Sequence, residues 1–382
     1  MNGSIKINLD NINYNSLFRI WRYTSTKIGR VSKTYIITKS FIRLIFFKIK
    51  FLEIEKNKPK VINTYQRKDY SDFIDRLTFN NSLGKCYLKY KFGLGHKWTY
   101  IKEVIKQAKL NKLEINETLL LYFLIKNNDV FIEYIKKELV IILFAEMQIF
   151  ENYIAQLAKQ VGCHTVGLQH GFYSNDYKKV TVNSINYKNV IVDEMFVWGK
   201  NTKDLLLEHN PNLKVTIVGR PSTHFLLGNN FNLNNGSPSS YLAILDAHEF
   251  SYTNDKVLKV VEGLANKNGV NFFIKYHPSN KPKDNHLQFN VLRDNKSLGL
   301  NPHFIGHRSS LLLELAADNF SCFVLEDSPF LKGKLQALYM DIYGKKLEPD
   351  DVLEYLAYTS NEAENLFHKE IKKLITISNQ ID

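Results

Sequence analysis

One segment in the middle of the chain restricts the folds that this sequence can adopt. Residues 139–144 form a short, continuous apolar run, as expected for a parallel strand that is buried on both faces. Residues 146–161 repeat apolar side chains at helical spacing, and Gly162 is placed to end that helix. A second strand is expected at 165–168. A strand, a helix and a strand in this order predict a parallel sheet and an α/β fold.

The same alternation continues on both sides of a polar segment. Residues 228–240 read GNNFNLNNGSPSS, a composition typical of an interdomain linker. A chain of 382 residues is longer than one core usually organises. We therefore expect two Rossmann-like α/β domains, residues 1–235 and 236–382, which face a central cleft. Further strands are predicted at 194–197, 215–218, 241–245, 271–276, 303–306 and 322–325, and further helices at 100–110, 117–127, 130–137, 201–209, 256–266, 311–317, 349–358 and 362–377, the last two as terminal helices of the second domain.

Cysteine usage and hydropathy exclude two classes of protein. Cys86, Cys163 and Cys322 lie far apart in the sequence, which excludes a disulfide framework and a cysteine zinc site and fits a reducing cytoplasm. No segment has the roughly 18–20 uncharged apolar residues that span a bilayer. The best candidate, residues 41–51, is interrupted by three basic side chains. We expect the protein to remain inside the cell.

The formal net charge of +13 is concentrated at the N-terminus. The first 50 residues hold ten Lys or Arg and a single acid, Asp10. This basic region, residues 1–60, is either a surface that docks on anionic lipid headgroups at the inner face of the plasma membrane or an ordinary solvated face. No helix-turn-helix, RRM or zinc-finger pattern accompanies the charge, so no nucleic-acid partner is expected.

Polar residues follow the first two predicted strands. Gln169, His170 and Gly171 come directly after the second one, and Gly171 permits a tight turn or a close approach of a ligand. His170 is either a phosphate donor or general base, or a histidine whose hydrogen bonds are satisfied within the turn. Glu146 follows the first strand. Its carboxylate is either a second candidate base or a group that stabilises the first turn of the next helix.

The second half of the chain places candidate residues in equivalent positions. Lys275 and the pair His277-Pro278 lie at the end of a predicted strand, where an imidazole is able to hydrogen-bond a phosphate. The run GHRSS at 306–310 precedes a helix. Ser309 or Ser310 suits the N-cap, and the same geometry aims free backbone N–H groups at an anion. Glu314 lies one turn further, either near ribose hydroxyls or as a solvated helix carboxylate.

The order of these short motifs resembles the GT-B glycosyltransferases of bacterial surface-polysaccharide synthesis. Along residues 139–330 they read LQHG, FVWGK followed by a helix, VGRP, KYHP and SSxxxE. The sequence is similar to the broad group of Kdo transferases, sialyl- and polysialyltransferases and CDP-glycerol polymerases. The acidic D/E-D/E-G motif of the sialyl- and polysialyltransferases is missing, since Asp193-Glu194 is followed by Met195. That departure argues against a sialic acid donor.

The resemblance implies that a nucleotide-sugar donor binds mainly to the C-terminal domain. A His-Pro pair followed by a Ser-Ser pair is reminiscent of enzymes that use CMP- or CDP-activated donors. No DxD follows a predicted strand, so the expectation is no bound metal and no cofactor besides the nucleotide-sugar co-substrate. The donor-binding candidates are Lys275, His277 and Pro278, Arg308, Ser309, Ser310 and Glu314, Asp246 after the first strand of the second domain, and Gly219.

The expected activity is transfer of a sugar to a hydroxyl of a growing cell-surface glycan or glycolipid, in a capsule or lipopolysaccharide, with inversion and without metal. His170 or Glu146 would deprotonate the acceptor hydroxyl. Three alternatives stay open. The first is a UDP-GlcNAc 2-epimerase-like enzyme, which would carry a GDSGG-like loop where this chain has GHRSS. The others are a CDP-alditol phosphotransferase and a non-catalytic protein on a GT-B frame.

Overall fold

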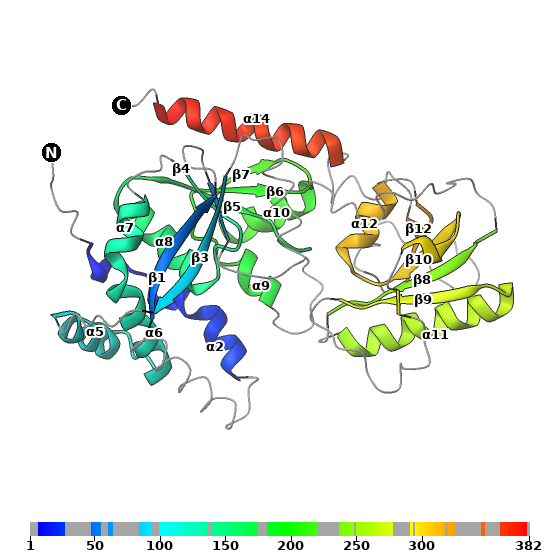
Figure 1. The fold of residues 1–382 in the computed structure, drawn as a ribbon, viewed down its shortest axis with the longest axis horizontal. Helices are drawn as coiled ribbons and strands as arrows, with labels where there is room; N and C mark the ends of the chain where they lie inside the picture. The colour runs from blue at the N-terminus through cyan, green and yellow to red at the C-terminus, as the bar shows by residue number, and fades with distance from the viewer. Residues whose placement is uncertain are drawn as a thin grey trace.

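The computed structural model describes residues 7–26, 47–54, 60–63, 84–92, 99–135, 140–173, 182–220, 237–247, 250–277, 291–292, 295–317, 320–325, 328, 345–347 and 360–379. These residues form two α/β domains, each built on a largely parallel sheet flanked by helices (Figure 1). The predicted α/β class with two Rossmann-like domains is therefore confirmed.

The first sheet has the strand order β1-β3-β2-β4-β5-β6-β7. The edge strand β1 runs antiparallel to β3, and every other neighbouring pair is parallel. From β2 the chain adds β3 on one side and β4 on the other, so the winding direction reverses between β2 and β4. The strands are β1 Phe47–Ile54, β2 Lys60–Asn63, β3 Gly84–Phe92, β4 Val140–Leu143, β5 His164–Leu168, β6 Glu194–Val197 and β7 Lys214–Ile217.

Helices cover this first sheet. Strands β4 to β7 lie where the sequence predicts them, and each is buried or half-buried along most of its length because helices pack on both faces. β1 to β3 were not predicted. The helices are α1 Tyr14–Leu17, α2 Arg19–Thr26, α5 Thr99–Leu110, α6 Ile115–Lys126, α7 Asn128–Ile135, α8 Ile149–Gln160, α9 Val182–Tyr187 and α10 Lys200–His209, with the 3-10 helix η1 at Leu9–Asn11.

The second sheet has the strand order β12-β11-β10-β8-β9, with only the edge strand β12 antiparallel. From β8 the chain adds β9 on one side and β10 on the other, so the winding reverses between β8 and β10. The elements are β8 Ser240–Ile244, α11 Ser251–Asn268, β9 Asn271–Lys275, η4 Asn295–Leu298, β10 Pro302–Gly306, α12 Ser310–Ala317, β11 Cys322–Val324 and β12 Lys345–Leu347.

The last helix, α14 (Ser360–Asn379), departs from the predicted domain division. We expected the terminal helices in the second domain. Instead α14 lies against the first sheet (Figure 1), where the ring of Phe367 meets Phe196 of β6 at 5.8 Å and Ile371 joins the same apolar cluster. Its apolar side chains cover a face of β4 and β6 that would otherwise be exposed. The predicted helix 349–358 and most of the linker 228–240 lie outside the described residues.

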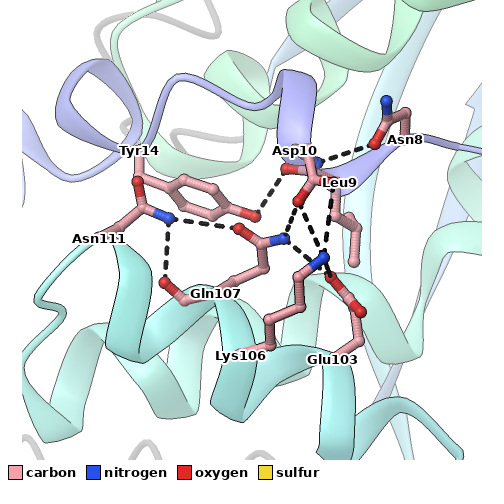
Figure 2. Close-up of polar contacts among 8 residues, drawn as sticks. All are labelled: Asn8, Leu9, Asp10, Tyr14, Glu103, Lys106, Gln107 and Asn111. Atoms are coloured by element: carbon pink, nitrogen blue, oxygen red, sulfur yellow. Dashed lines mark hydrogen bonds and ion pairs between the residues drawn. The ribbon is translucent and has the colours of Figure 1, made fainter.

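The N-terminal residues 7–26 are bound to the first domain. The carboxylate of Asp10 accepts hydrogen bonds from Gln107 Nε2 at 2.5 Å and Lys106 Nζ at 3.2 Å (Figure 2). Arg22 binds the buried carboxylate of Glu117 through two nitrogens, at 2.6 and 3.1 Å. At least one cation of the basic N-terminal region is therefore neutralised within the fold. Residues 1–6, 27–46 and 55–59 of that region lie outside the described part of the chain. None of the described helices has the length and hydropathy of a membrane span.

Candidate functional site

Glu146 lies at the carboxyl end of β4, where the winding of the first sheet reverses. It belongs to the turn before α8, whereas Glu151 occupies the first helical turn and accepts a hydrogen bond from Ala145 N at 2.5 Å. The interpretation of Glu146 as a first-turn helix stabiliser is therefore wrong. Its side chain is buried, and its Oε2 atom has no hydrogen-bond partner among the described residues.

Burial favours the protonated form of the Glu146 carboxyl. Burial is the main cause that raises its pKa from 4.5 to about 8, and the nearby charge of Glu151 raises the pKa as well. The backbone N–H groups of Glu146 and Met147 lower the pKa by less. A protonated carboxylic acid donates a proton and does not accept one. Glu146 is therefore poorly suited to act as a general base at neutral pH.

His170 lies beside this position, at the end of the next strand, β5. Its ring is half-buried between Phe144, at 5.7 Å, and Tyr173, at 6.4 Å. The buried side chain of Gln169 fixes the turn that carries it. Gln169 Nε2 donates to the carbonyl of Gly171 at 2.9 Å, and its Oε1 accepts from the backbone N–H of Trp198 at 2.8 Å. The His170 turn is thus attached to the end of β6.

Arg220 follows β7, and its side chain reaches from the first domain to the second. Gly219 before it has a φ of +76°, a left-handed conformation that favours glycine. The Arg220 guanidinium lies over the ring of Trp198, 4.5 Å from the ring centroid. It forms an ion pair with Glu314 and donates a hydrogen bond of 3.3 Å to Ser310 Oγ, both on α12.

Apolar contacts accompany this polar one. Phe172 and Trp198 of the first domain are buried in the same cluster as Leu312 and Leu313 of α12. The helix that we expected at the donor phosphate is therefore packed directly against the strand ends of the other domain.

Asp246 and His307 meet where the winding of the second sheet reverses. Asp246 follows β8 and His307 follows β10, both side chains are buried, and His307 Nδ1 lies 3.7 Å from Asp246 Oδ2. Arg308 Nε donates a hydrogen bond of 3.2 Å to His307 Nδ1, and its guanidinium lies 4.2 Å from the ring centroid of Phe250. Asn254 fixes the strand end by exchanging two hydrogen bonds, of 2.8 and 3.0 Å, with the backbone of Asp246.

The remaining candidates lie at the same edge of the second sheet. Lys275 is the last residue of β9 and His277 follows two positions later, both half-buried. Ser309 directly precedes α12, and its carbonyl accepts a hydrogen bond from Leu312 N at 3.0 Å. Glu314 is not a solvated carboxylate, because only 6% of its side chain is exposed and it pairs with Arg220. Pro278 lies outside the described residues.

The structure adds three residues that the sequence analysis did not select, Trp198, Arg220 and His307. Each one directly follows a predicted strand or the glycine at its end, which is the rule that selected Gln169, His170 and His277. Among the described residues, no three His, Cys, Asp or Glu side chains gather as they would around a metal ion. A metal-independent site stays a prediction.

The sequence matches no protein-family model and no curated protein. The fold is similar to that of UDP-N-acetylglucosamine 2-epimerase from Rickettsia bellii, with a TM-score of 0.49 and 14% identity over 85% of this chain and 98% of that one. The Methanocaldococcus jannaschii UDP-GlcNAc 2-epimerase, solved with UDP-GlcNAc and UDP, has a TM-score of 0.41 and 14% identity over 82% of this chain and 91% of that one.

A third similar structure is a mutant of S. aureus TarM, solved with fondaparinux, alpha-GlcNAc-glycerol and UDP. Its TM-score is 0.37, with 11% identity over 64% of this chain and 55% of that one. All three likenesses are weak. The α/β architecture described above rests on the strand order of the two sheets themselves.

Proposed function

We propose that the chain is a nucleotide-sugar-dependent glycosyltransferase. The observation that carries this proposal is the position of the polar residues at the two reversal points. In the first sheet, Glu146 lies at the reversal point and His170 lies one strand further. In the second sheet, Asp246 and His307 lie at the reversal point. Open α/β sheets bind ligands outside the carboxyl ends of their strands at such points. Two such edges in contact suit a reaction that joins two substrates.

The donor half of the proposed site belongs to the second domain. Ser309 and Ser310 lie at the N-terminus of α12, where backbone N–H groups favour a phosphate. His277, Lys275 and Arg308 would offset the charge that develops on the leaving phosphate. Asp246 and Glu314 are further donor-side residues of the second domain, and Gly219 is one from the first domain. The order of the sequence motifs supports the whole set.

His170 is the proposed base, because burial raises the pKa of the Glu146 carboxyl and favours its protonated form. The acceptor hydroxyl gives its proton to the His170 imidazole while its oxygen forms a bond to the anomeric carbon. The bond from that carbon to the phosphate oxygen breaks with inversion, and its electron pair leaves on the nucleotide phosphate. The balance needs no metal and no redox partner.

The acceptor is proposed to be a glycan or glycolipid of a bacterial cell surface, on the strength of the motif order alone. A capsule or lipopolysaccharide precursor would place the protein at the inner face of the plasma membrane. The basic residues of the region 1–60 are proposed to contribute to that attachment, as lysine and arginine do near anionic lipid.

The first test is a thermal-shift screen with CMP, CDP, UDP, GDP and ADP, each without and with magnesium. A ligand at about a hundred times its Kd stabilises a fold by about 2.7 kcal/mol. We expect one nucleotide to raise the melting temperature without magnesium, and His277→Ala to abolish the shift. His209→Ala, in α10 of the first domain, is the matched control and should keep the shift. No response to any nucleotide would overturn the donor site.

Product analysis then separates the transferase from its alternatives. A transferase releases the nucleotide and extends a hydroxyl acceptor, whereas an epimerase returns an intact nucleotide sugar with altered stereochemistry. A phosphotransferase releases CMP from a CDP-alditol, and a non-catalytic protein binds nucleotide without turnover. His170→Ala should lower kcat by about 10²–10⁴-fold, as expected for loss of a general base. A smaller loss for His170→Ala than for Glu146→Gln would reverse the assignment of the base.

A further inference from the structure

A continuous chain of contacts joins the turn of His170 to helix α12. Gln169 Oε1 binds the backbone of Trp198, the Trp198 ring lies under the guanidinium of Arg220, and Arg220 binds Ser310 and Glu314. The first three of these residues belong to the first domain and the last two to the second. The contacts therefore connect the two halves of the site directly.

The geometry of Arg220 suits the planar guanidinium of an arginine. Its planar guanidinium stacks on an indole ring with one face, while its N–H groups bind a hydroxyl and a carboxylate at its edge. Ser310 and Glu314 are four positions apart on α12, so they lie on the same side of the helix. The Arg220 and Glu314 side chains are only 12% and 6% exposed, respectively.

We propose that Arg220 is a positioning residue that fixes helix α12 against the first domain and so sets the donor half of the site relative to His170. Arg220 acts through α12, which carries Ser309 and Ser310 at its N-terminus. The coupling between domains stands on the contacts themselves, and its effect on donor binding rests on the proposed function. Arg220→Ala and Glu314→Gln should both release α12, since each removes one side of the ion pair.

Hydrogen–deuterium exchange of the α12 backbone tests the coupling without any substrate. We expect amides of residues 310–317 to exchange at least about tenfold faster in Arg220→Ala and in Glu314→Gln, since local opening becomes easier. Arg220→Lys keeps the charge but loses the stacked fork, so its exchange should be intermediate. Lys214→Ala is the matched control, because Lys214 pairs at 2.9 Å with the buried carboxylate of Glu194 inside the first domain. Unchanged exchange of α12 in both release variants would overturn the proposal.

Kinetics give the second readout. With the nucleotide and acceptor found in the screen, Arg220→Ala should raise the KM for the donor about tenfold or more, whereas the KM for the acceptor should stay within about twofold. Arg220→Lys should recover part of the loss. An equal rise in both KM values, or full activity in Arg220→Ala, would contradict a role in donor positioning. If the wild-type protein binds no nucleotide, the proposed function fails while the exchange experiment still decides the coupling.

Discussion

The side-chain oxygen of Gln169 accepts a hydrogen bond of 2.8 Å from the backbone N–H of Trp198, so one buried amide joins the ends of β5 and β6. Its Nε2 group holds the carbonyl of Gly171 on the other side. Gln169→Leu would leave both backbone groups without these bonds. We expect a loss of about 1–3 kcal/mol in the free energy of unfolding and a matching loss of activity.

Chemical unfolding and steady-state kinetics measure these effects. Gln148→Leu is the control, because Gln148 precedes α8 without a side-chain capping hydrogen bond. A Gln169→Leu variant as stable as the control would show that solvent replaces the buried amide, which contradicts the proposed attachment of the His170 turn.

The raised pKa of Glu146 should make the free energy of unfolding depend on pH in an unusual way. Its pKa is about 8 in the folded chain and near 4.5 in an unfolded one, so only the folded chain holds this proton between those values. The stabilisation is complete below about pH 4.5 and is lost as pH rises toward 8, at about 1.4 kcal/mol per pH unit. Glu146→Gln cannot titrate there. The free energy of unfolding in urea should therefore rise for the variant relative to the wild type as the pH increases from 5 to 8. A difference that stays constant over this range would rule out a protonated Glu146 carboxyl in the folded chain.

For the Arg220–Glu314 pair, we expect either single truncation to lower the free energy of unfolding strongly. Replacing both charged side chains together should lower it only slightly. Arg220→Ala leaves a buried carboxylate uncompensated and should cost about 3–5 kcal/mol. The double variant Arg220→Met/Glu314→Leu replaces the pair with apolar side chains of similar size and should recover most of that loss. Denaturant unfolding of the two variants measures the difference. Equal destabilisation would mean that the cost comes from the lost packing of Arg220 and not from an uncompensated Glu314 carboxylate.

At Gly306, the last residue of β10, we expect a single added methyl group to disturb the packing. A Cβ at Gly306 would lie 2.7 Å from Leu312 Cδ1 and 2.9 Å from the backbone oxygen of Ile244. Gly306→Ala should therefore cost about 1–3 kcal/mol through overpacking. Gly263→Ala is the control, because a Cβ there meets no atom within 4 Å and α11 is helical, so it should stabilise by about 0.5–1 kcal/mol. Differential scanning calorimetry distinguishes the two signs.

The central part of the fold was predictable because its strands are buried on both faces. β4 reads VIIL, an apolar run that identifies a buried strand without knowledge of the neighbouring strands. β1 reads FKIKFLEI, and its alternating lysines were interpreted as a basic surface. That strand is an edge strand, with one face able to expose charge, and its partner β3 lies far along the sequence.

The site was predictable only within each domain. Residues at strand ends were found because a parallel sheet presents its carboxyl ends at one edge. Arg220 and Ser310 are 90 residues apart, and no local pattern shows that they meet. The same holds for Glu314, which looks like a surface carboxylate on its helix until the other domain covers it.

The position of α14 changes what can be cut from this protein. The chain leaves the first domain after Arg220 and is again part of it from Ser360 onward, so the second domain is an insertion, tethered at both ends. An isolated N-terminal half would lack the helix that covers β4 and β6, and it would expose that apolar face to aggregation. Removal of the second domain, in contrast, would leave α14 with its host, but it would expose Phe172 and Trp198, which are buried in one cluster with α12.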